Sequence, residues 1–345
     1  MTERMRCVAL DGTGGPDVLV PGSCSVPEPG PGDLLVRVRA CGVCGHDLLA
    51  RRGALAAGHG AVLGHEIAGE VVAAGSDVEP DLVGRRVALV QRIPCGRCPE
   101  CTAGRTTLCR QGPGFYGEDV PGGYAEYVLA SPRNAVPVPD AIPDEAAAIL
   151  SCAVGTGLRA LRRAGTGPGD VVLITGAGGG VGVHAVELAK HLGATVVALT
   201  GTATKEKRLL ELGADAVLVS PDARAVRDCV RDLGAPRGAD VALELTGGPT
   251  FPMALRALGP RGRLVLIGNT EPATLPLDPG LSILKELTVY GSAHADTTDL
   301  ADVVGLVASG AVTPVPARTW PLDQAAGAHA AVERREVTGR AVLVP

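Results

Sequence analysis

The sequence predicts an α/β protein in which a β-rich unit is joined to a doubly wound, parallel sheet. Three observations support this fold class. The length of 345 residues suggests two domains. Short β-rich runs, separated by glycine and proline, fill roughly the first 150 residues. From Asp170 onward, apolar strands alternate with helices, which is typical of a parallel sheet covered on both faces.

The composition excludes several classes of function. A net charge of −5 gives no reason to expect binding to nucleic acid or to an acidic membrane. No apolar stretch is long enough to span a bilayer, and the first residues lack the apolar region of a signal peptide. We therefore expect a cytoplasmic protein whose ten cysteines are reduced thiols or metal ligands, and not disulfides.

The β-rich unit is expected to contain four clear strands and one helix. The strands are Leu34–Arg39, Glu66–Ala73, Arg86–Val90 and Ala125–Leu129. Four prolines interrupt the chain before them, at Pro21, Pro27, Pro29 and Pro31. An alanine-rich helix is expected over Asp144–Leu150, with Asp140 or Asp144 as its N-terminal cap.

The parallel sheet begins at Val171–Thr175, a continuous apolar run that is typical of a strand buried on both faces. Its other strands are expected at Thr195–Thr200, Ala216–Ser220, Asp240–Thr246, Arg263–Gly268 and Leu287–Gly291. The helices between them are expected at Val181–Leu192, Thr204–Leu212, Ala225–Leu233 and Thr250–Leu258. A last helix, Asp299–Ser309, precedes short strands at Ala317–Pro321 and Arg340–Val344, which should return to the first unit.

Four closely spaced cysteines form the most informative motif, with the spacing C-x2-C-x2-C-x7-C. They are Cys95, Cys98, Cys101 and Cys109. Glycine and proline residues between them supply the turns that bring four thiolates to one point. Four sulfur ligands with no open position are typical of a structural zinc. The rival interpretations are an iron–sulfur cluster, for which ferredoxins use a shorter last gap followed by proline, and a disulfide knot.

A glycine-rich loop, G-A-G-G-G-V-G, follows the strand that begins at Val171 and precedes a helix. Glycines at this position let the backbone approach a pyrophosphate, and the helix N-terminus favours its negative charge. A G-x-G-x-x-G pattern is weak by itself, but its place between a buried strand and a helix favours a dinucleotide site. The alternative is a turn that only allows close packing of helix on sheet.

The end of the second strand of the sheet bears on the choice of cofactor. An NAD site usually has an acidic residue there, which binds the ribose 2′-hydroxyl. Thr200 occupies the position, and no acid follows until Glu206. Thr200 and Thr202 can donate to a 2′-phosphate, and Lys205 lies close by in the sequence. These residues favour NADP(H) over NAD(H), the alternative being a solvated basic surface.

Three further motifs occur in order around the four cysteines and the glycine loop: C-G-V-C-G-H-D at 41–47, G-H-E at 64–66 and G-G-Y-A-E-Y-V at 122–128. Together they make the chain resemble the zinc-containing alcohol dehydrogenases of the medium-chain dehydrogenase/reductase family, over essentially its whole length. The resemblance implies a GroES-like, zinc-binding catalytic domain over residues 1–152 and 293–345. It implies a Rossmann dinucleotide-binding domain over residues 153–292.

The same resemblance implies a second, catalytic zinc with an open fourth position. Its ligands would be Cys44, His65 and Cys152. Glu66 resembles the carboxylate that can approach the metal. Asp47 resembles the residue that orients the ligand histidine, and Thr156 resembles the residue that packs against the nicotinamide. The expected cofactor-binding residues are Gly176, Gly178, Gly179, Gly180, Val181, Gly182, Thr200, Thr202, Lys205, Gly268 and Arg340. For Arg340, the alternative to a pyrophosphate contact is an ordinary surface arginine.

Two positions depart from the family pattern. The family usually has Ser or Thr two residues after the first zinc cysteine, where a hydroxyl passes on the proton of the alcohol. His46 occupies that position here. An imidazole can relay protons, but it can also be an extra ligand or point away from the site. The second relay position, a histidine in many relatives, is Leu49, so solvent access is the alternative route.

The substrate pocket is expected to have an aromatic wall in a chain that contains few aromatic residues. Phe115 and Tyr116, together with His46, fall where the family has its substrate pocket. Tyr124 and Tyr127 are expected in the β core instead. The pocket should therefore accept a small-molecule substrate between an aromatic wall and aliphatic side chains.

The sequence therefore predicts an alcohol dehydrogenase or carbonyl reductase that uses two zinc ions and a nicotinamide cofactor. One alternative is a reductase of a conjugated C=C or C=N bond, with the zinc retained. Another is a non-enzymatic, NADPH-binding protein of the same fold, which would be favoured if Cys44, His65 and Cys152 did not converge. No nucleic-acid or membrane partner is expected, and the resemblance leads us to expect a homodimer or homotetramer.

Overall fold

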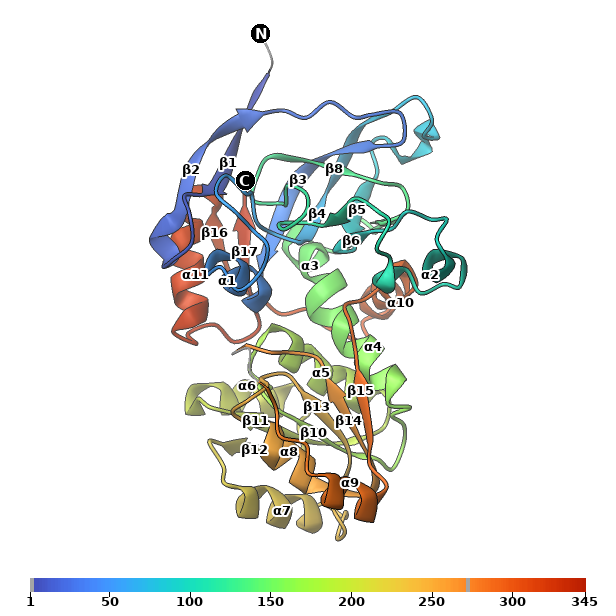
Figure 1. Ribbon diagram of the computed structural model, residues 1–345, viewed down its shortest axis with the longest axis vertical. Coiled ribbons are helices and arrows are strands. Elements are labelled where there is room, and N and C mark those ends of the chain that lie inside the picture. Colours follow the sequence, from blue (N-terminus) through green and yellow to red (C-terminus); the bar gives the residue numbers. More distant parts are fainter. Residues whose placement is uncertain (1–2, 271–273) are drawn as a thin grey trace. The chain divides into compact units, whose positions relative to one another are not determined.

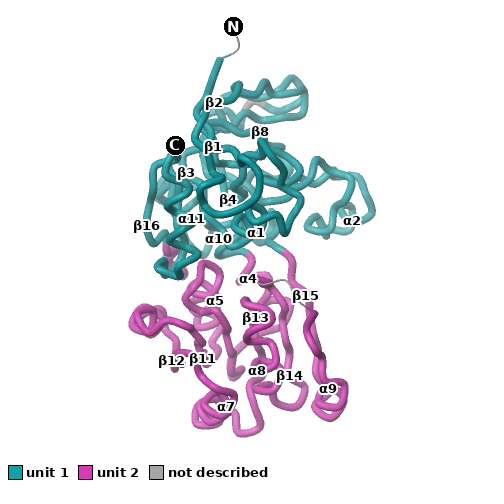
Figure 2. The backbone as a smooth tube through the Cα atoms, turned by 60° about the vertical axis from the view of Figure 1, so that its left-hand side comes forward, with its two compact units in different colours: residues 1–155, 294–310, 316–345 teal, residues 156–293, 311–315 magenta. Residues whose placement is uncertain are grey.

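The computed structural model describes residues 3–270 and 274–345, and its chain divides into two compact units (Figures 1 and 2). Unit 1 contains residues 1–155, 294–310 and 316–345, and unit 2 contains residues 156–293 and 311–315. The sequence prediction set the boundaries at 152/153 and 292/293. No helix in the described ranges is long and apolar enough to cross a membrane.

Unit 1 is built on a seven-stranded sheet in the order β16-β17-β3-β4-β5-β9, with β8 also paired to β3. The strands are β3 (Leu34–Val43), β4 (Glu66–Ala74), β5 (Arg86–Leu89), β8 (Tyr127–Ala130), β9 (Ala135–Pro137), β16 (Pro316–Pro321) and β17 (Arg340–Val344). Along the middle of β3, buried Val36 and Val38 alternate with the more exposed Arg37 and Arg39, as expected for a sheet with one buried face. The C-terminal strand β17 pairs antiparallel with β3, so the chain end returns to the sheet that its N-terminal half began.

The helices of unit 1 carry most of the residues that matter below. They are α1 (Gly45–Arg51), α2 (Pro99–Thr102), α3 (Asp144–Ile149), the π-helical turn η4 (Leu150–Val154), α10 (Thr297–Ala308) and α11 (Ala325–Glu333). Helix α3 packs against β3 and β4. Its alanines are buried, because small side chains allow a helix to lie close to a sheet.

A hairpin at the N-terminus and helix α11 were not predicted from the sequence. The hairpin consists of β1 (Arg4–Leu10) and β2 (Leu19–Ser25), and Pro21 lies within β2. Proline fits there because β2 pairs only with β1 in the described structure, which leaves its other edge free of ladder hydrogen bonds. Helix α11 is rich in alanine, so it shows little of the apolar–polar contrast from which helices are predicted.

One cysteine pair contradicts the expectation that the thiols are reduced. Cys7 and Cys24 form a disulfide across the β1–β2 hairpin. In this hairpin Met5 lies opposite Cys24 and Cys7 lies opposite Gly22, so the two cysteines are diagonal neighbours on one face. Their Cα atoms lie 6.3 Å apart, within the range that a disulfide spans. The other eight cysteines are free.

Unit 2 is a six-stranded parallel sheet in the order β12-β11-β10-β13-β14-β15. Its strands are β10 (Val171–Ile174), β11 (Thr195–Thr200), β12 (Ala216–Val219), β13 (Ala239–Glu244), β14 (Leu258–Leu266) and β15 (Thr288–Gly291). Its helices are α4 (Gly155–Arg163), α5 (Gly180–His191), α6 (Glu206–Glu211), α7 (Ala223–Asp232), α8 (Phe251–Ala257) and α9 (Pro279–Lys285). The predicted fold class is confirmed, and the strand order reverses between β10 and β13, where such sheets bind ligands.

Candidate active site

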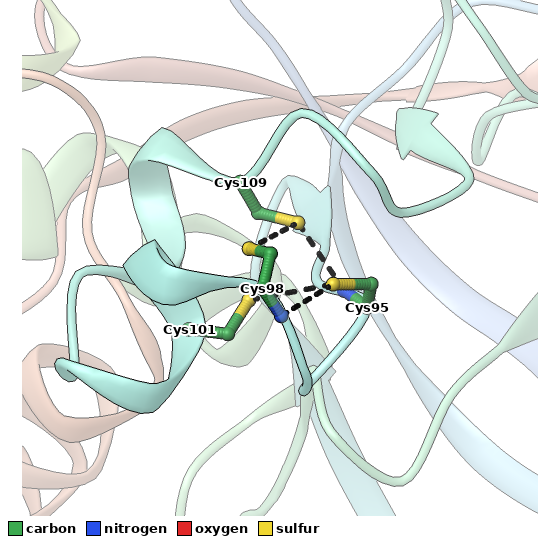
Figure 3. A group of neighbouring side chains, drawn as sticks. All are labelled: Cys95, Cys98, Cys101 and Cys109. Atoms are coloured by element: carbon green, nitrogen blue, oxygen red, sulfur yellow. Dashed lines mark hydrogen bonds between the residues drawn. The ribbon is translucent and has the colours of Figure 1, made fainter.

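The four-cysteine lobe brings its sulfurs together as the spacing predicts (Figure 3). The sulfurs of Cys95 and Cys101 lie 3.9 Å apart, and so do those of Cys98 and Cys109. Zinc–sulfur bonds of about 2.3 Å in a tetrahedron put the sulfurs about 3.8 Å apart, so the four residues fit a structural zinc. Backbone N–H groups also donate to the sulfurs, for example from Cys95 to Cys109 at 3.3 Å.

A second donor set forms in unit 1 from three segments that are distant in sequence. Cys44 is the N-cap of α1, His65 directly precedes β4, and Cys152 lies in the π-helical turn η4. With Glu66, their donor atoms all lie within 4.8 Å of one another, and the two sulfurs are 3.9 Å apart. The predicted grouping of Cys44, His65 and Cys152 is therefore a geometric fact of the structure. Two thiols and an imidazole, with a carboxylate next to them, fit a catalytic zinc.

The two thiols of this donor set differ in acidity. The contact with the Cys152 thiol lowers the pKa of Cys44 well below its ordinary value, although burial acts in the opposite direction. The same contact, together with burial, raises the pKa of Cys152. The shared contact therefore shifts the pKa values of the two thiols in opposite directions, and a divalent ion bound by both sulfurs requires both to lose their protons.

Asp47 fixes the orientation of both His65 and Cys44. Its Oδ1 accepts from His65 Nδ1 at 3.0 Å, and its Oδ2 accepts from the backbone N–H of Cys44 at 2.8 Å. Burial alone would lower the pKa of His65, but the Asp47 carboxylate raises it well above its ordinary value. With Nδ1 on Asp47, Nε2 is the nitrogen left for a metal, which is the expected arrangement for an imidazole ligand.

Glu66 is buried next to the donor set and is paired with Arg340. Its Oε1 lies 2.9 Å from Arg340 Nη2, yet neither carboxylate oxygen has a partner in good hydrogen-bond geometry among the described residues. Burial raises the pKa of Glu66 to about 7, with Arg340 acting against it. A Cβ on Gly42 would lie 2.0 Å from Glu66 Oε2, so glycine at 42 makes room for the carboxylate. Orphaned buried oxygens beside two thiols and an imidazole also fit a cation.

Arg340 is buried, so the alternative of an ordinary surface arginine is wrong. Its guanidinium lies against Glu66 and 3.4 Å from the carbonyl oxygen of Val43. A pyrophosphate contact by Arg340 stays a prediction.

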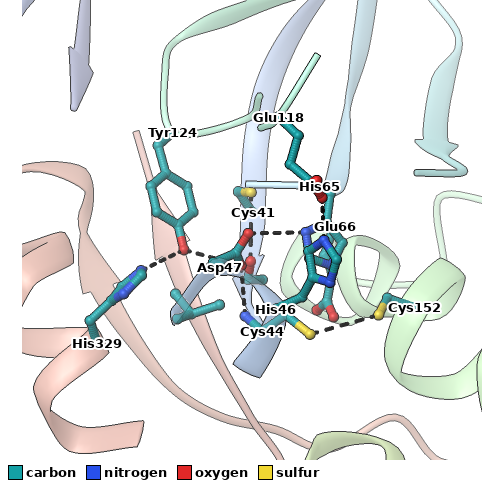
Figure 4. A network of polar contacts seen from close by, with 12 residues as sticks. Cys41, Cys44, His46, Asp47, His65, Glu66, Glu118, Tyr124, Cys152 and His329 are labelled. Atoms are coloured by element: carbon teal, nitrogen blue, oxygen red, sulfur yellow. Dashed lines mark hydrogen bonds and ion pairs between the residues drawn. The ribbon is translucent and has the colours of Figure 1, made fainter. Parts of the chain in front are cut away.

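His46 stands beside the donor set without belonging to it (Figure 4). Its ring centroid lies 5.3 Å from that of His65 and 5.3 Å from that of Phe115. Its Nε2 forms a close contact with a carboxylate oxygen of Glu118, from the loop after β7 (Gly114–Phe115). Glu118 was not predicted from the sequence, because only the fold brings this loop next to α1.

The two aromatic residues predicted in the pocket wall lie in different surroundings, and only Phe115 is next to the donor set. Phe115 contacts the rings of His46, His65 and His294. Tyr116 points the other way, as the period of an extended chain requires. It is buried in the β core, where its hydroxyl donates to the Leu129 carbonyl at 2.9 Å.

Tyr124 is buried in the core as predicted, and its hydroxyl also extends the metal-site network. The hydroxyl lies 3.4 Å from Asp47 Oδ2 and 2.9 Å from His329 Nε2. His329, on α11, faces Arg51 with its Nδ1 at 3.5 Å, and Arg51 pairs with Glu333. Polar contacts therefore connect His65 through Asp47 and Tyr124 to His329 (Figure 4), and His329 contacts the Arg51–Glu333 pair.

The glycine loop of unit 2 lies between β10 and α5, which begins at Gly180. Gly176 has φ +57°, and a Cβ on Gly182 would lie 2.5 Å from the Gly176 carbonyl oxygen. Neither position accepts a side chain without strain, so the loop and the first turn of α5 pack backbone to backbone. The predicted residues Gly178 and Gly179 lie in the loop, and Val181 lies in the first turn of α5. The N-terminus of α5 is therefore available to a phosphate.

Thr200 and Lys205 lie against the glycine loop. Thr200 ends β11, and a Cβ on Gly178 would lie 3.3 Å from its hydroxyl oxygen. Lys205 is buried and its Nζ donates to the Gly178 carbonyl at 3.3 Å, so for this residue the solvated-surface alternative is wrong. The Thr202 N–H lies 3.3 Å from the Thr200 hydroxyl.

Glu244 holds the loop after β13 in place. It was not predicted from the sequence, because a single acidic residue in a buried strand belongs to no recognisable motif. Its Oε1 accepts from Thr175 Oγ1 and from the N–H groups of Thr246 and Gly247, each at 2.9 Å. Gly268 directly faces this loop, since a Cβ there would lie 2.0 Å from the Leu245 carbonyl oxygen. The loop after β13 is thereby held at the sheet edge that also carries the glycine loop.

Thr156, predicted to pack on the nicotinamide, is buried in the first turn of α4. Its hydroxyl oxygen has no hydrogen-bond partner among the described residues. That leaves a polar group free for a bound molecule, and its role stays a prediction.

Comparisons with known proteins agree with both units. The family described as the alcohol dehydrogenase GroES-like domain matches residues 30–140, and that described as zinc-binding dehydrogenase matches residues 180–309. An acryloyl-coenzyme A reductase of Sulfurisphaera tokodaii is 32% identical, with 92% of this chain and 94% of the reductase covered. An L-threonine 3-dehydrogenase of Aeromonas salmonicida is 38% identical, with 77% and 78% covered. The crystal structure of AibC is 41% identical with a TM-score of 0.92, covering 100% of this chain and 97% of AibC.

We predict that each donor set binds one zinc ion. Loss of the two ions should have different consequences for the stability of the fold. Cys152→Ser should remove about one zinc per chain and leave the thermal unfolding midpoint nearly unchanged, because an open site contributes little to folding. Cys98→Ser should also release zinc and should lower the midpoint strongly, because a closed site is part of the fold. Elemental analysis and thermal unfolding measure both effects, with Cys229→Ser, outside both donor sets, as the control. One zinc or fewer in the unmodified protein would contradict the open site.

Because His329 is buried and neutral, we predict that the unfolding free energy falls as the pH is lowered. Burial lowers its pKa to about 4 from an ordinary value of 6.5, although Asp47 and Glu333 act to raise it and only Arg51 adds to the lowering. The unfolded chain therefore takes up a proton first as the pH falls. The contribution of neutral His329 is complete above pH 6.5 and is lost toward pH 4. Between pH 7.5 and 5.5 this costs about 1 kcal/mol of unfolding free energy.

The matched experiment compares the unmodified protein with His329→Gln in urea unfolding at both pH values. The variant should be less stable at pH 7.5, because it loses the ring's contacts with Tyr124 and Arg51. It should lose about 1 kcal/mol less than the unmodified protein on the change to pH 5.5. Equal losses in the two proteins would show that His329 takes up its proton in the folded state as readily as in the unfolded one.

Proposed function

Because the chain belongs to the zinc-containing, alcohol dehydrogenase-like branch of the medium-chain dehydrogenase/reductase family, we propose that it transfers a hydride between a nicotinamide cofactor and a substrate with a carbonyl or hydroxyl oxygen. The observation that carries this proposal is the convergence of the donor atoms of Cys44, His65 and Cys152, with the Glu66 carboxylate beside them. A non-enzymatic, NADPH-binding protein would not need that convergence. A zinc ion held there would supply Lewis-acid polarisation of the substrate oxygen.

The residues around the donor set have separate tasks in this proposal. Asp47 holds His65 in one orientation and one tautomer. Phe115 offers an apolar face to the substrate and excludes water from that side. His46, held by Glu118, is the group nearest to pass a proton to or from the reacting substrate, in place of the usual hydroxyl relay.

For the substrate, we propose an α,β-unsaturated carbonyl compound such as an enoyl thioester. The hydride adds to the β carbon, a proton adds to the α carbon, and the C=C bond becomes single while NADPH becomes NADP⁺. Two observations support this choice. One is the likeness to an acryloyl-coenzyme A reductase over 92% of the chain. The other is the altered alcohol relay, with His46 and Leu49 at its two positions.

The second candidate is the reversible oxidation of an alcohol to an aldehyde or ketone. It is supported by the likeness to L-threonine 3-dehydrogenase and by the same donor set, because both reactions need an electrophile at the substrate oxygen. In that case His46 would accept the hydroxyl proton. The two candidates differ in which carbon receives the hydride.

Formation of a homo-oligomer is also a proposal, as either a homodimer or a homotetramer. It is supported by large apolar side chains in unit 2, where Ile283 and Leu284 on α9 are 74% and 85% exposed. Val289 is exposed on β15, the last strand of the sheet. Exposed apolar side chains beside a free sheet edge favour contact with a second copy.

The cofactor proposal predicts that NADPH binds more tightly than NADH. Thr200→Asp should reverse the order, with a change of at least about tenfold, or ~1.4 kcal/mol, in the ratio of dissociation constants. A carboxylate at the end of β11 repels a 2′-phosphate and accepts from a 2′-hydroxyl. Thr200→Ser keeps the hydroxyl and should keep the order. Fluorescence titration with both nucleotides measures the ratio, and tighter binding of NADH by the unmodified protein would overturn the proposal.

The substrate proposal predicts where deuterium from NADPD is found in the product. With acryloyl-CoA or crotonyl-CoA, mass spectrometry and NMR should locate one deuterium at the β carbon of the saturated thioester. Cys44→Ser should abolish this turnover, because the substrate oxygen loses its electrophile. Deuterium only at the carbonyl carbon of saturated aldehydes or ketones would support the second candidate. Turnover of neither substrate class would contradict both.

A further inference from the structure

His46 occupies a position from which a fourth protein ligand would be expected. It lies in the first turn of α1, two residues after the ligand Cys44. Its ring centroid is 5.3 Å from the ring centroid of the ligand His65. A second imidazole added to Cys44, His65 and Cys152 would complete a closed, four-ligand zinc site, which is a structural site and not a catalytic one.

The structure holds the His46 ring elsewhere. The donor atoms that converge belong to Cys44, His65, Glu66 and Cys152, and His46 is not among them. Its Nε2 is engaged by Glu118 instead. The Phe115 ring packs on the His46 ring at a centroid distance of 5.3 Å and an interplanar angle of 35°. Phe115 ends β7 and Glu118 lies in the turn that follows it, so these two neighbours of His46 come from one short segment.

That loop is a well-defined turn, so it can hold a side chain in place. The backbone N–H groups of Glu118, Asp119 and Val120 all donate to the Phe115 carbonyl, at 3.3, 3.0 and 3.2 Å. The Phe115 N–H donates to Asp119 Oδ2 at 2.9 Å. Gly117 has φ +82°, a conformation that glycine adopts readily, and its N–H donates to the Val120 carbonyl at 2.8 Å.

We propose that Glu118 is a positioning residue that keeps His46 out of the metal coordination sphere, so that the substrate oxygen does not compete with a second imidazole for the metal. The contact between Nε2 and Glu118 holds the imidazole where neither of its ring nitrogens joins the converging donor atoms. The inference rests on the metal site of the proposed function, but it does not depend on which substrate is reduced or oxidised.

The test uses X-ray absorption at cobalt placed in the open site, with zinc retained in the four-cysteine site. The unmodified protein should show one imidazole on cobalt, from His65, and Glu118→Ala should show two. Glu118→Ala should also release its metal to a chelator more slowly, because the site has gained a ligand. The double variant Glu118→Ala with His46→Ala should return to one imidazole.

Matched controls separate this effect from general damage. Glu118→Gln keeps an acceptor oxygen for Nε2–H and should show one imidazole. Glu126→Ala removes a surface carboxylate of the same unit that pairs with Arg6, and it should change nothing. His46→Ala should match the unmodified protein in ligand count and metal release, which tests the inference even if Glu118→Ala does not fold.

Two results would overturn the inference: two imidazoles on cobalt in the unmodified protein, or one imidazole in a folded Glu118→Ala variant. Neither result depends on turnover. If the protein did not catalyse the proposed reaction but the cobalt spectra showed the expected numbers of imidazoles, the role of Glu118 would therefore still stand.

Discussion

The buried carboxylate of Asp47 is the contact on which the candidate metal site depends. It receives the Nδ1–H of His65, the N–H of Cys44 and, more weakly, the hydroxyl of Tyr124. One side chain therefore orients two of the three candidate ligands and connects them to the core. A carboxylate in this position is costly to bury unless its oxygens accept hydrogen bonds, and these three donors supply them.

The positions of Cys44, His65 and Cys152 follow from the strands and helices on which they lie. Cys44 marks the end of β3 and the start of α1, and His65 directly precedes β4, which pairs with β3. These two ligands are therefore brought together by one strand pair. Cys152 comes from the wider turn of η4, where an irregular helix displaces a side chain from the regular helical path. The third ligand depends on packing of α3 against β3 and β4, not on pairing within the sheet.

The parts of the structure that depend only on residues close together in the chain could be predicted from the sequence. The four cysteines and the glycine loop lie within short segments, so their spacing alone predicts a convergence of sulfurs and a strand–turn–helix. Cys44, His65 and Cys152 could be grouped only through family resemblance, because no local pattern relates them. Phe115 and Tyr116 were both assigned to the pocket from the family resemblance, by their place after the four-cysteine lobe, but neighbours in an extended segment face opposite sides. Glu118 and His329 had no local signal, since their partners are on other segments.

The C-terminal return of the chain is part of the metal site and not only a cover for the sheet. The site region gathers the carboxyl groups of Asp47 and Glu66 and the thiol of Cys44, all from the N-terminal half. Arg340, at the start of β17, is the buried cation opposite Glu66. Its position is fixed by the antiparallel pairing of Ala341 with Val43, one residue before Cys44.

A buried ion pair contributes little net stability, but a buried carboxylate without its cation is strongly unfavourable. Glu66 therefore requires that β17 be in place before its charge can be buried. The dinucleotide-binding unit interrupts the chain between these two halves of one site. Its insertion is tolerated because β17 still pairs with β3, and this pairing returns the compensating charge to the metal ligands.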